Sequence, residues 1–344
     1  MVAARPAVVT APGGRHVRLE PGTRLLGESE LARGEREVHA ALLGSIRARV
    51  LTQLRGPVKR RAVPSEPQPA DRYVRVGDLR FHYLEFAGDG PPLVFLHATG
   101  FHAWLWLPYA RRFAATHHVL ALDQRGHGES DKPPTGYRWE AFGADLKGFL
   151  DVLGLDGVRA VGHSKGATAM AASAAAGTRR LARAVLIEPV LVSAPHVTEP
   201  AWDNPLAAGA RKRRNVWPSR EVMFASLRGR MPFETWEEEF VRLYVDHGVA
   251  DRPDGQVELR CPGEIEAQVY AHAPMTDGFA LLERLAVPTL VIRGERSPGF
   301  GATEADEAIR RLPAGTLRTV AGAGHFAPME RPAEVGDAIA GFLG

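Results

Sequence analysis

The sequence predicts an α/β fold in which a mostly parallel sheet of eight strands is flanked by helices. From Tyr73 onward, short runs of β-branched and aliphatic residues alternate with helical patterns, which is typical of a parallel sheet covered by helices. Of the 344 residues, 45% are hydrophobic and 24% are charged, close to the average for soluble globular proteins. This length allows one large core with a sizeable insertion.

The first seventy residues differ from the rest. A helix is predicted over about 29–54, because apolar residues recur at every fourth position and form one stripe. These residues are Val38, Leu42, Ile46, Val50 and Leu54. The basic run at 55–61 and the proline-rich segment at 64–69 indicate an exposed linker rather than a membrane or nucleic-acid site. We expect residues 1–70 to form an N-terminal extension that covers the main domain or contributes to a homo-oligomer contact.

The expected strands follow one another along the main domain. They lie at 73–76, 79–86, 93–97, 119–123, 158–162, 184–188, 289–293 and 317–320. Helices fill the gaps between most of them. One helix is marked by an apolar face that should lie against the sheet. Its residues are Phe142, Leu146, Phe149, Leu150 and Leu153.

Residues 193–284 interrupt this alternation. The segment holds helical patterns and no convincing central strand, so we interpret it as a helical cap inserted after the sixth strand. The core of the fold then comprises residues 71–192 and 285–344. Within the cap, the basic run from Arg211 to Arg214 permits two interpretations, a clamp for an acidic substrate or a solvated helix face, and we favour the second.

The strongest motif in the chain is Gly162-His163-Ser164-Lys165-Gly166. It follows an apolar strand and precedes a helix of small residues, which is the context that a Gly-x-Ser-x-Gly nucleophile elbow requires. The glycines allow a tight strand-to-helix turn that raises the serine hydroxyl into a crevice, and the helix N-terminus stabilises developing negative charge. Ser164 is therefore the candidate nucleophile.

Together with three further segments, this motif resembles the α/β-hydrolase superfamily. The segments are Leu96-His97-Ala98-Thr99-Gly100, Asp123-Gln124-Arg125-Gly126-His127-Gly128-Glu129-Ser130 and, near the end of the chain, Gly324-His325. The resemblance covers residues 73–344 in the family's order and leaves the N-terminal extension unexplained. It implies a serine-nucleophile esterase or lactonase with a helical lid.

The resemblance also implies the general base. His325 stands in a glycine-rich loop after the last expected strand and before the final helix, where the family places its catalytic histidine. Three other histidines belong to family motifs in which they have structural parts. These are His97, His127 and His163.

An oxyanion hole is implied at the backbone amides of Lys165 and Thr99. Lys165 follows the nucleophile, and Thr99 follows the family's His-Gly pair. That pair is His97-Ala98 in this chain, so alanine stands where the family has glycine. Because alanine has a Cβ, the loop can adopt slightly fewer backbone conformations than it could with glycine.

The third member of the triad departs from the family pattern. The family commonly carries an aspartate in a Gly-x-x-Asp loop, which reads Gly294-Glu295-Arg296-Ser297-Pro298 here. A missing acceptor on the histidine can lower turnover by about 10⁴-fold, so another group is needed. Glu188 ends the strand beside the nucleophile's strand, as the acid does in zearalenone-type lactone hydrolases. We favour Glu188 over Glu295 and over a dyad without an acid.

Charge and cysteine content argue against several classes of protein. Lys and Arg outnumber Asp and Glu by only 43 to 40, which is too small an excess to argue for a nucleic-acid partner. Cys261 is the single cysteine, so neither an intrachain disulfide nor a thiolate cluster for a metal is expected. No apolar run approaches the ~18–20 residues that span a bilayer. We expect a cytoplasmic protein with no membrane span, metal or cofactor.

These features predict a hydrolase that cleaves a carboxylic ester or lactone through a serine acyl-enzyme. Ser164 attacks the carbonyl, His325 takes its proton, the two amides hold the oxyanion, and water releases the acid. The expected substrate is a small ester or lactone with an apolar acyl part. Two alternatives stay open: a low-turnover ligand-binding or receptor-like member of the fold, and serine-dependent carbon–carbon bond hydrolysis or perhydrolysis.

Overall fold

The computed structural model describes residues 8–10, 16–18, 67–193 and 197–344. The chain divides into two compact units, Met1–Ser65 and Glu66–Gly344. In the first unit, β1 (Val8–Thr10) pairs antiparallel with β2 (His16–Arg18). The helix predicted at 29–54 and the basic run that follows it lie outside the described residues.

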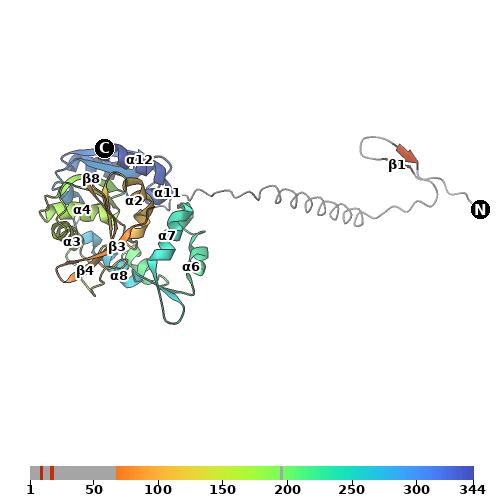
Figure 1. Cartoon of the computed structure of the whole chain (residues 1–344), viewed down its shortest axis with the longest axis horizontal. Helices are drawn as coiled ribbons and strands as arrows, with labels where there is room; N and C mark the ends of the chain where they lie inside the picture. The colour runs from red at the N-terminus through yellow and green to blue at the C-terminus, as the bar shows by residue number, and fades with distance from the viewer. Residues whose placement is uncertain (1–7, 11–15, 19–66, 194–196) are drawn as a thin grey trace, which may run out of the picture. The chain divides into compact units, whose positions relative to one another are not determined.

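The second unit is built on one eight-stranded sheet (Figure 1). Its strands are β3 (Ala70–Val76), β4 (Leu79–Phe86), β5 (Pro92–Leu96), β6 (His118–Leu122), β7 (Val158–His163), β8 (Leu181–Ile187), β12 (Thr289–Gly294) and β13 (Gly315–Val320). Their order across the sheet is β13-β12-β8-β7-β5-β6-β4-β3. The pairs β3–β4 and β4–β6 are antiparallel, and the other five neighbouring pairs are parallel. The predicted mostly parallel sheet of eight strands is therefore confirmed.

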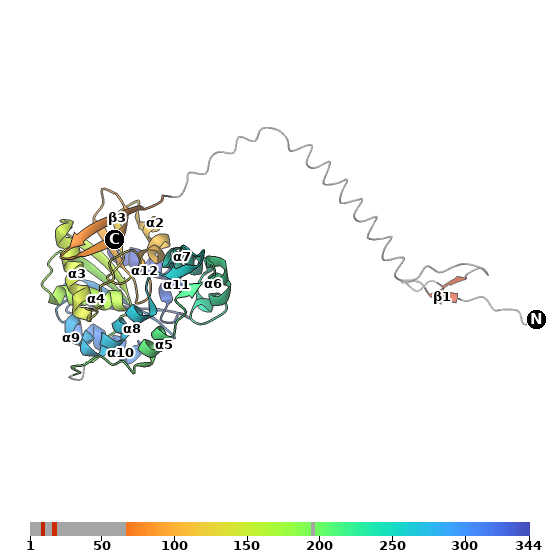
Figure 2. The same ribbon diagram turned by 90° about the horizontal axis from the view of Figure 1, so that it is seen from below.

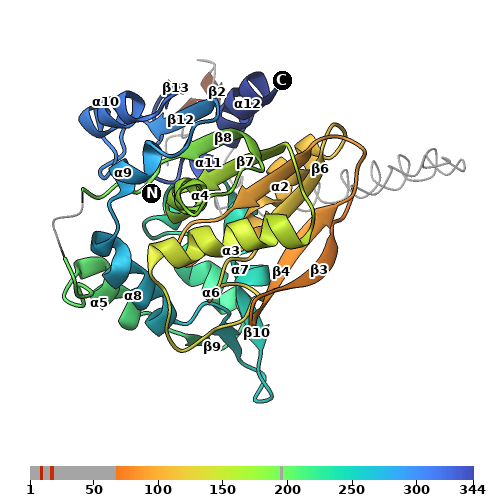
Figure 3. The ribbon, with the colours of Figure 1, turned by 90° about the vertical axis from the view of Figure 1, so that its left-hand side faces the viewer.

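Helices cover both faces of this sheet, because each central strand is apolar on both sides. In β5, Leu93 and Phe95 pack into one core cluster, whereas Val94 and Leu96 pack into the other. The first cluster includes side chains of η1 (Ala103–Trp106), α2 (Leu107–Phe113), α11 (Ala327–Glu330) and α12 (Pro332–Leu343). The second includes side chains of α3 (Trp139–Val152), α4 (Lys165–Ala175) and α10 (Ala302–Arg311), and Figure 3 shows α3 and α4 on the same side of the sheet.

An insertion separates β8 from β12 at the position expected for the cap. Its elements are α5 (Pro205–Arg211), β9 (Val216–Trp217), α6 (Arg220–Leu227), η2 (Phe233–Thr235), α7 (Glu238–Gly248), β10 (Val249–Asp251), β11 (Val257–Leu259), α8 (Gly263–His272), η3 (Ala273–Met275) and α9 (Gly278–Leu282). Helix α5 packs against α8 and α6 against α7 (Figure 2). At its end, α9 places Phe279 and Leu282 in the core cluster of the main sheet.

The insertion also holds three short strands, which the helical interpretation of this segment did not include. They form a separate antiparallel sheet in the order β10-β11-β9. A turn joins β10 to β11, in which Arg252 N donates to Gln256 O over 2.9 Å and Gly255 has a φ of 79°. Strands of two or three residues are too short to show a period-two pattern, so the sequence carried no signal for them.

Candidate active site

Ser164 lies on a sharp turn between β7 and α4. Its φ is 55°, and its backbone N–H donates to Ile187 O over 2.9 Å. A Cβ on Gly162 would lie 2.6 Å from the amide nitrogen of Ala167, and one on Gly166 would lie 2.4 Å from Leu96 O. Only glycine fits at these two positions, so both glycines of the motif are needed for the turn. The serine follows the strand and precedes the helix, as the elbow interpretation expects.

His325 approaches Ser164 from the loop between β13 and α11. Its Nε2 lies 3.1 Å from Ser164 Oγ. The backbone oxygen of His325 accepts a hydrogen bond from His163 Nε2 at 2.8 Å, and the Phe326 ring packs edge-on against the imidazole, with ring centroids 5.2 Å apart. The structure thus brings the predicted nucleophile and base within hydrogen-bond distance.

Glu188 lies at the end of β8 with its side chain fully buried. Its Oε2 is 3.1 Å from His325 Nδ1 and accepts a hydrogen bond from the Ser297 hydroxyl, while its Oε1 accepts from Gly294 N over 2.6 Å. Two of these donors belong to the loop in which the family aspartate was expected. This loop therefore supplies donors to the glutamate instead of supplying the acid.

Glu295 is not placed at the imidazole. It is exposed, and its Oε2 accepts a hydrogen bond from Gly322 N over 2.8 Å. The carboxylate facing His325 Nδ1 is that of Glu188. Of the two acids considered from the sequence, the structure brings only Glu188 to the histidine.

Backbone strain is concentrated at this site. Within the described part of the chain, the non-glycine residues with positive φ are Ser164, at 55°, and Glu188, at 49°. Such conformations cost about 1–3 kcal/mol each and persist where the surrounding structure enforces them, which is common at functional sites. The two strained residues stand at the ends of the neighbouring strands β7 and β8.

The oxyanion-hole candidates lie where the end of β5 meets the start of α4. Lys165 begins α4, so its N–H is among the first amides of the helix, which have no intrahelical acceptor. Thr99 is buried in the loop after β5. The close approach of Gly166 to Leu96 O and His97 O places this loop beside the helix start. Such an arrangement can direct two N–H groups at a developing oxyanion.

Two buried histidines hold the loops around the site. His97 Nδ1 donates to Ala98 O at 2.7 Å, while its Nε2 accepts from Gln124 N at 3.0 Å. Burial lowers the pKa of His97 and of His163 to about 3. Both rings are therefore neutral at pH 7, and the hydrogen bond from His163 Nε2 to His325 O fixes the backbone of the base.

A cavity of about 580 Å³ adjoins these residues. Thr99, Phe101 and Phe326 line it from the core, and residues of the insertion close the other side. The insertion supplies aromatic side chains together with arginines, among them Arg213 and Arg214. Neither arginine belongs to the helix face that the sequence suggested, because α5 ends at residue 211 and both lie in the loop after it, although Arg214 is exposed to solvent as expected.

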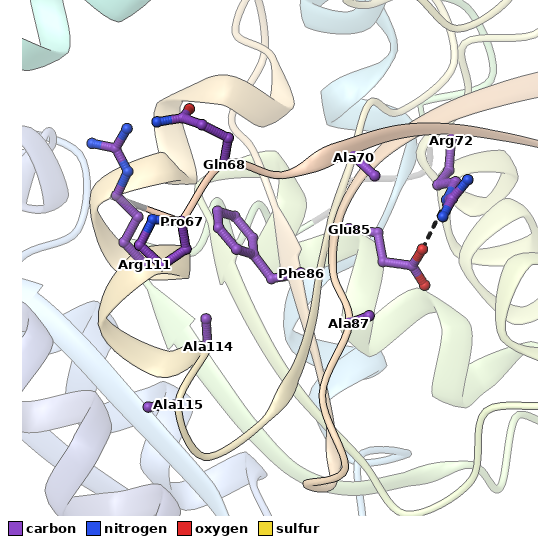
Figure 4. Close-up of a pocket in the computed structure, with 10 residues that line it drawn as sticks. All are labelled: Pro67, Gln68, Ala70, Arg72, Glu85, Phe86, Ala87, Arg111, Ala114 and Ala115. Atoms are coloured by element: carbon purple, nitrogen blue, oxygen red, sulfur yellow. Dashed lines mark hydrogen bonds and ion pairs between the residues drawn. The ribbon is translucent and has the colours of Figure 1, made fainter. Parts of the chain in front are cut away.

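A second cavity, of about 460 Å³, lies at the start of β3 (Figure 4). The ten residues that line it include no serine, cysteine or histidine. Its Arg72 pairs with Glu85 at 2.9 Å. This cavity therefore offers no nucleophile, whereas the first cavity reaches the site through Thr99 of the oxyanion loop and Phe326 beside the base.

Among the described residues, no group of three or more His, Cys, Asp or Glu side chains is placed to hold a metal ion. Within the same residues, no helix is long and apolar enough to cross a membrane. Cys261 is buried, which raises the pKa of its thiol to about 12.

Comparison with known proteins identifies relatives of the second unit. The sequence pattern of the alpha/beta hydrolase family matches residues 93–338. The 2-(acetamidomethylene)succinate hydrolase of Mesorhizobium japonicum is 28% identical over 272 residues, which cover 79% of this chain and 94% of that protein. A crystal structure of E-2-(acetamidomethylene)succinate hydrolase has a TM-score of 0.70 and 26% identity, covering 80% of this chain and 99% of that one. The N-formylmaleamate deformylase of Pseudomonas putida is 36% identical over 117 residues, 34% of this chain and 44% of that protein.

Proposed function

Because the chain belongs to the α/β-hydrolase family, we propose that it is a serine hydrolase that cleaves a carboxylic ester or lactone. The observation that carries the proposal is the continuous contact from Ser164 Oγ through the imidazole of His325 to Glu188. A serine, a base within hydrogen-bond reach and a group that orients the base form the arrangement of an activated nucleophile. The named relatives are hydrolases, which supports hydrolysis as the reaction.

The reaction begins with attack of Ser164 Oγ on the carbonyl carbon. His325 Nε2 takes the hydroxyl proton as the C–O bond forms, and the carbonyl electrons move onto the oxygen. The amides of Lys165 and Thr99 stabilise that oxyanion, an interaction worth about 3–4 kcal/mol for each donor in comparable enzymes. Collapse of the tetrahedral intermediate expels the alcohol, which receives the proton from the imidazole.

Hydrolysis of the acyl-enzyme repeats these steps with water. His325 removes a proton from water, the resulting hydroxide attacks the acyl carbon, and the proton returns to Ser164 Oγ as the acid leaves. Glu188 accepts from Nδ1–H throughout, which keeps Nε2 available as the acceptor and stabilises the imidazolium in each half of the reaction. Ser164, His325 and Glu188 thus supply the nucleophile, the base and the acid that orients the base.

The relatives also suggest a second kind of scissile bond, the N-acyl bond. One of them is named as the deformylase of an N-formyl compound, so cleavage of an N-acyl bond by the same residues is the second candidate. Substrates that differ only in the bond cleaved, an ester, a lactone and an N-acyl amide of one acyl group, separate the two. We expect the ester or lactone to give the highest kcat/KM.

Labelling with a fluorophosphonate probe tests the nucleophile directly. Folded wild-type protein should be labelled at Ser164, and both heat-unfolded protein and the Ser164→Ala variant should not. A folded wild-type protein that stays unlabelled would contradict the proposal and favour the low-turnover, ligand-binding alternative. A small-molecule substrate, a cytoplasmic location and self-association stay predictions of the sequence.

A further inference from the structure

The cavity beside Thr99 and Phe326 carries an excess of positive charge. Three arginines line it, Arg213, Arg214 and Arg230, together with a single carboxylate, Glu266. A guanidinium that faces a cavity without a carboxylate partner attracts an anion, and its planar fork matches the two oxygens of a carboxylate. The excess points to a ligand that carries negative charge.

The first arginine stands over the oxyanion loop. Arg213 Nη1 lies 3.3 Å, and Glu266 Oε1 lies 2.8 Å, from the position that a Cβ on Gly100 would occupy. Arg213 donates from Nη1 to Glu266 and from Nη2 to Tyr244 Oη. Glu266 therefore compensates the charge of Arg213, and this pair forms the wall of the cavity next to Thr99.

The other two arginines have no such compensation. Arg214 donates from Nε to Val216 O over 2.8 Å, and its guanidinium carbon lies 4.6 Å from the centroid of the Trp217 ring. Arg230, just beyond α6, is exposed, and none of its side-chain nitrogens bonds to a group in the described part of the chain. Among the described residues no carboxylate pairs with either guanidinium, so two full positive charges face the cavity.

Two neighbouring arginines that do not line the cavity are paired with carboxylates. Arg211 pairs with Glu264 at 2.9 Å, and Arg228 pairs with Glu238 at 2.9 Å. Each lies within three residues of a cavity arginine, on the same segment of the insertion. Arg211 and Arg228 therefore have acidic partners, whereas Arg214 and Arg230, which line the cavity, have none among the described residues.

We propose that this cavity binds a carboxylate carried by the substrate, with Arg230 and Arg214 as its ligands. The substrate is then a half-ester of a dicarboxylic acid, or a lactone that carries a free carboxylate, whose apolar stem contacts the aromatic walls that Trp217 and Phe233 provide. The inference rests on the proposed function for the position of the reacting carbonyl at Ser164. It differs from the sequence expectation of a substrate with an apolar acyl part, because the cavity holds both apolar and cationic groups.

Ligand binding to the Ser164→Ala variant tests the inference without requiring turnover. The probe is glutarate, a short dicarboxylate, titrated calorimetrically at about pH 8, where both carboxyl groups are ionised. We expect saturable binding that Arg230→Gln weakens by about 10- to 100-fold, the usual effect of losing one hydrogen-bonded charge. Arg228→Gln, the matched control two residues away, should change the Kd by less than about twofold.

Two further comparisons make the test specific. The neutral diamide glutaramide should bind at least about 10-fold more weakly than glutarate, because it cannot pair with a guanidinium. Arg214→Gln should also weaken glutarate binding, whereas Arg211→Gln, whose guanidinium pairs with Glu264, should not. Circular dichroism of each variant checks that the fold is retained.

Three results would overturn the inference: no saturable binding of glutarate, equal affinity for glutarate and glutaramide, or equal losses in Arg230→Gln and Arg228→Gln. None of these results bears on the nucleophile, because Ser164 is absent from the protein used. Failure of the proposed function would instead appear as absent fluorophosphonate labelling in wild-type protein. The two failures are therefore distinguishable.

Discussion

Glu188 places an ionisable carboxyl group in the protein interior, which is unfavourable unless hydrogen-bond donors surround it. Its side chain is fully buried, and an ionised carboxylate without partners in such a place would cost several kcal/mol. Three donors offset that cost, from Gly294 N, the Ser297 hydroxyl and His325 Nδ1. A carboxylate held in this position can stabilise the imidazolium that forms when Ser164 gives up its proton.

Replacing this carboxylate tests its role as the triad acid. We expect Glu188→Gln to lower the kcat for ester hydrolysis by up to about 10⁴-fold, because an amide can donate to Nδ1 and favour the unproductive tautomer of His325. Steady-state kinetics with an activated ester measures the effect. Glu295→Gln is the control, and it should leave kcat within a few-fold, since Glu295 bonds to Gly322 N rather than to the imidazole. The opposite ranking of the two variants would refute the assignment.

The principal residues of the site could be predicted from the sequence because each follows a local signal. Ser164 stands in its glycine motif, His325 in the loop after the last strand, and Glu188 at the end of a neighbouring strand. The donors from Gly294 and Ser297 could not be predicted, because they depend on how a distant loop folds over β8. Local spacing carries no information about a contact between segments more than one hundred residues apart.

The arginines of the cavity illustrate the same limit. The basic run at 211–214 has the composition of a solvated helix face, and the sequence does not show that α5 ends at residue 211. Beyond that point the chain turns, so Arg213 and Arg214 line the cavity while Arg211 pairs with Glu264 outside it. Because the end of α5 was not predicted, Arg213 and Arg214 were assigned to a helix face and not to the wall of a cavity.

At the scale of secondary-structure elements, the longer strands could be predicted from the sequence and the shortest ones could not. The strands of the main sheet are five to eight residues long, and the central ones carry apolar side chains for both faces, so their expected and observed ranges agree closely. The strands of the insertion have two or three residues and depend on pairing with each other. Pairing between segments is a tertiary property, which strands of this length do not show in their own sequence.

Helix α4 carries an unusual side chain at its first turn. Lys165 is buried to 1% exposure, and its Nζ has no hydrogen-bond partner among the described residues. The ring of Phe142 on α3 contacts this amine, with its centroid 4.0 Å from Nζ. Burial lowers the pKa of this lysine well below its usual value. The folded protein therefore disfavours the charged form at this helix contact.

Replacing Lys165 with methionine should stabilise the protein, because a side chain of similar size then fills the site without a polar group. We expect Lys165→Met to raise the free energy of unfolding by about 1–3 kcal/mol at neutral pH. The wild-type penalty should shrink as pH rises toward 10.5, the ordinary lysine pKa, because the unfolded chain then also loses the proton. Urea denaturation between pH 7 and about 10 measures both effects.

Lys147→Met is the control for this prediction. Lys147 is on the neighbouring helix α3, is 38% exposed and pairs with Asp151 at 2.7 Å. Its replacement should give no stabilisation and no change in the alkaline pH dependence. A Lys165→Met variant that is destabilised, or that keeps the wild-type rise of stability with pH, would show that the buried amine has a favourable partner.

At the scale of the whole molecule, the site is assembled from segments distant in sequence. Ser164 and Glu188 follow neighbouring parallel strands, Thr99 follows β5, and His325 follows β13. The carboxyl ends of parallel strands meet at one edge of a sheet, so this topology alone brings four loops together. The insertion then adds the other wall of the cavity. The positive charge of that wall was the property of the site that was hardest to predict from the sequence.

The same packing buries a set of neutral histidines, and this makes the stability of the whole unit sensitive to acid. Burial lowers the pKa of His97 and His163 to about 3, lowers that of His102 to about 4, and lowers that of His127 well below its usual value. One group acts in the opposite direction. Burial alone would lower the pKa of His82, but its hydrogen bond with Asp123 raises it.

The sign of the pH effect follows from proton binding. Below about pH 6.5 the unfolded chain protonates these four histidines and the folded chain does not, so acid favours unfolding. Each buried histidine should lower the free energy of unfolding by about 1.4 kcal/mol for each pH unit well below 6.5, and His82 offsets at most one of them. Urea denaturation between about pH 7 and pH 5 should therefore show that the free energy of unfolding falls by several kcal/mol.

The variant His102→Gln should bind about one proton fewer on unfolding, so its free energy of unfolding should fall less steeply with decreasing pH than that of wild type. A stability that is independent of pH over this range would mean that these rings are protonated, or reached by water, in the folded protein.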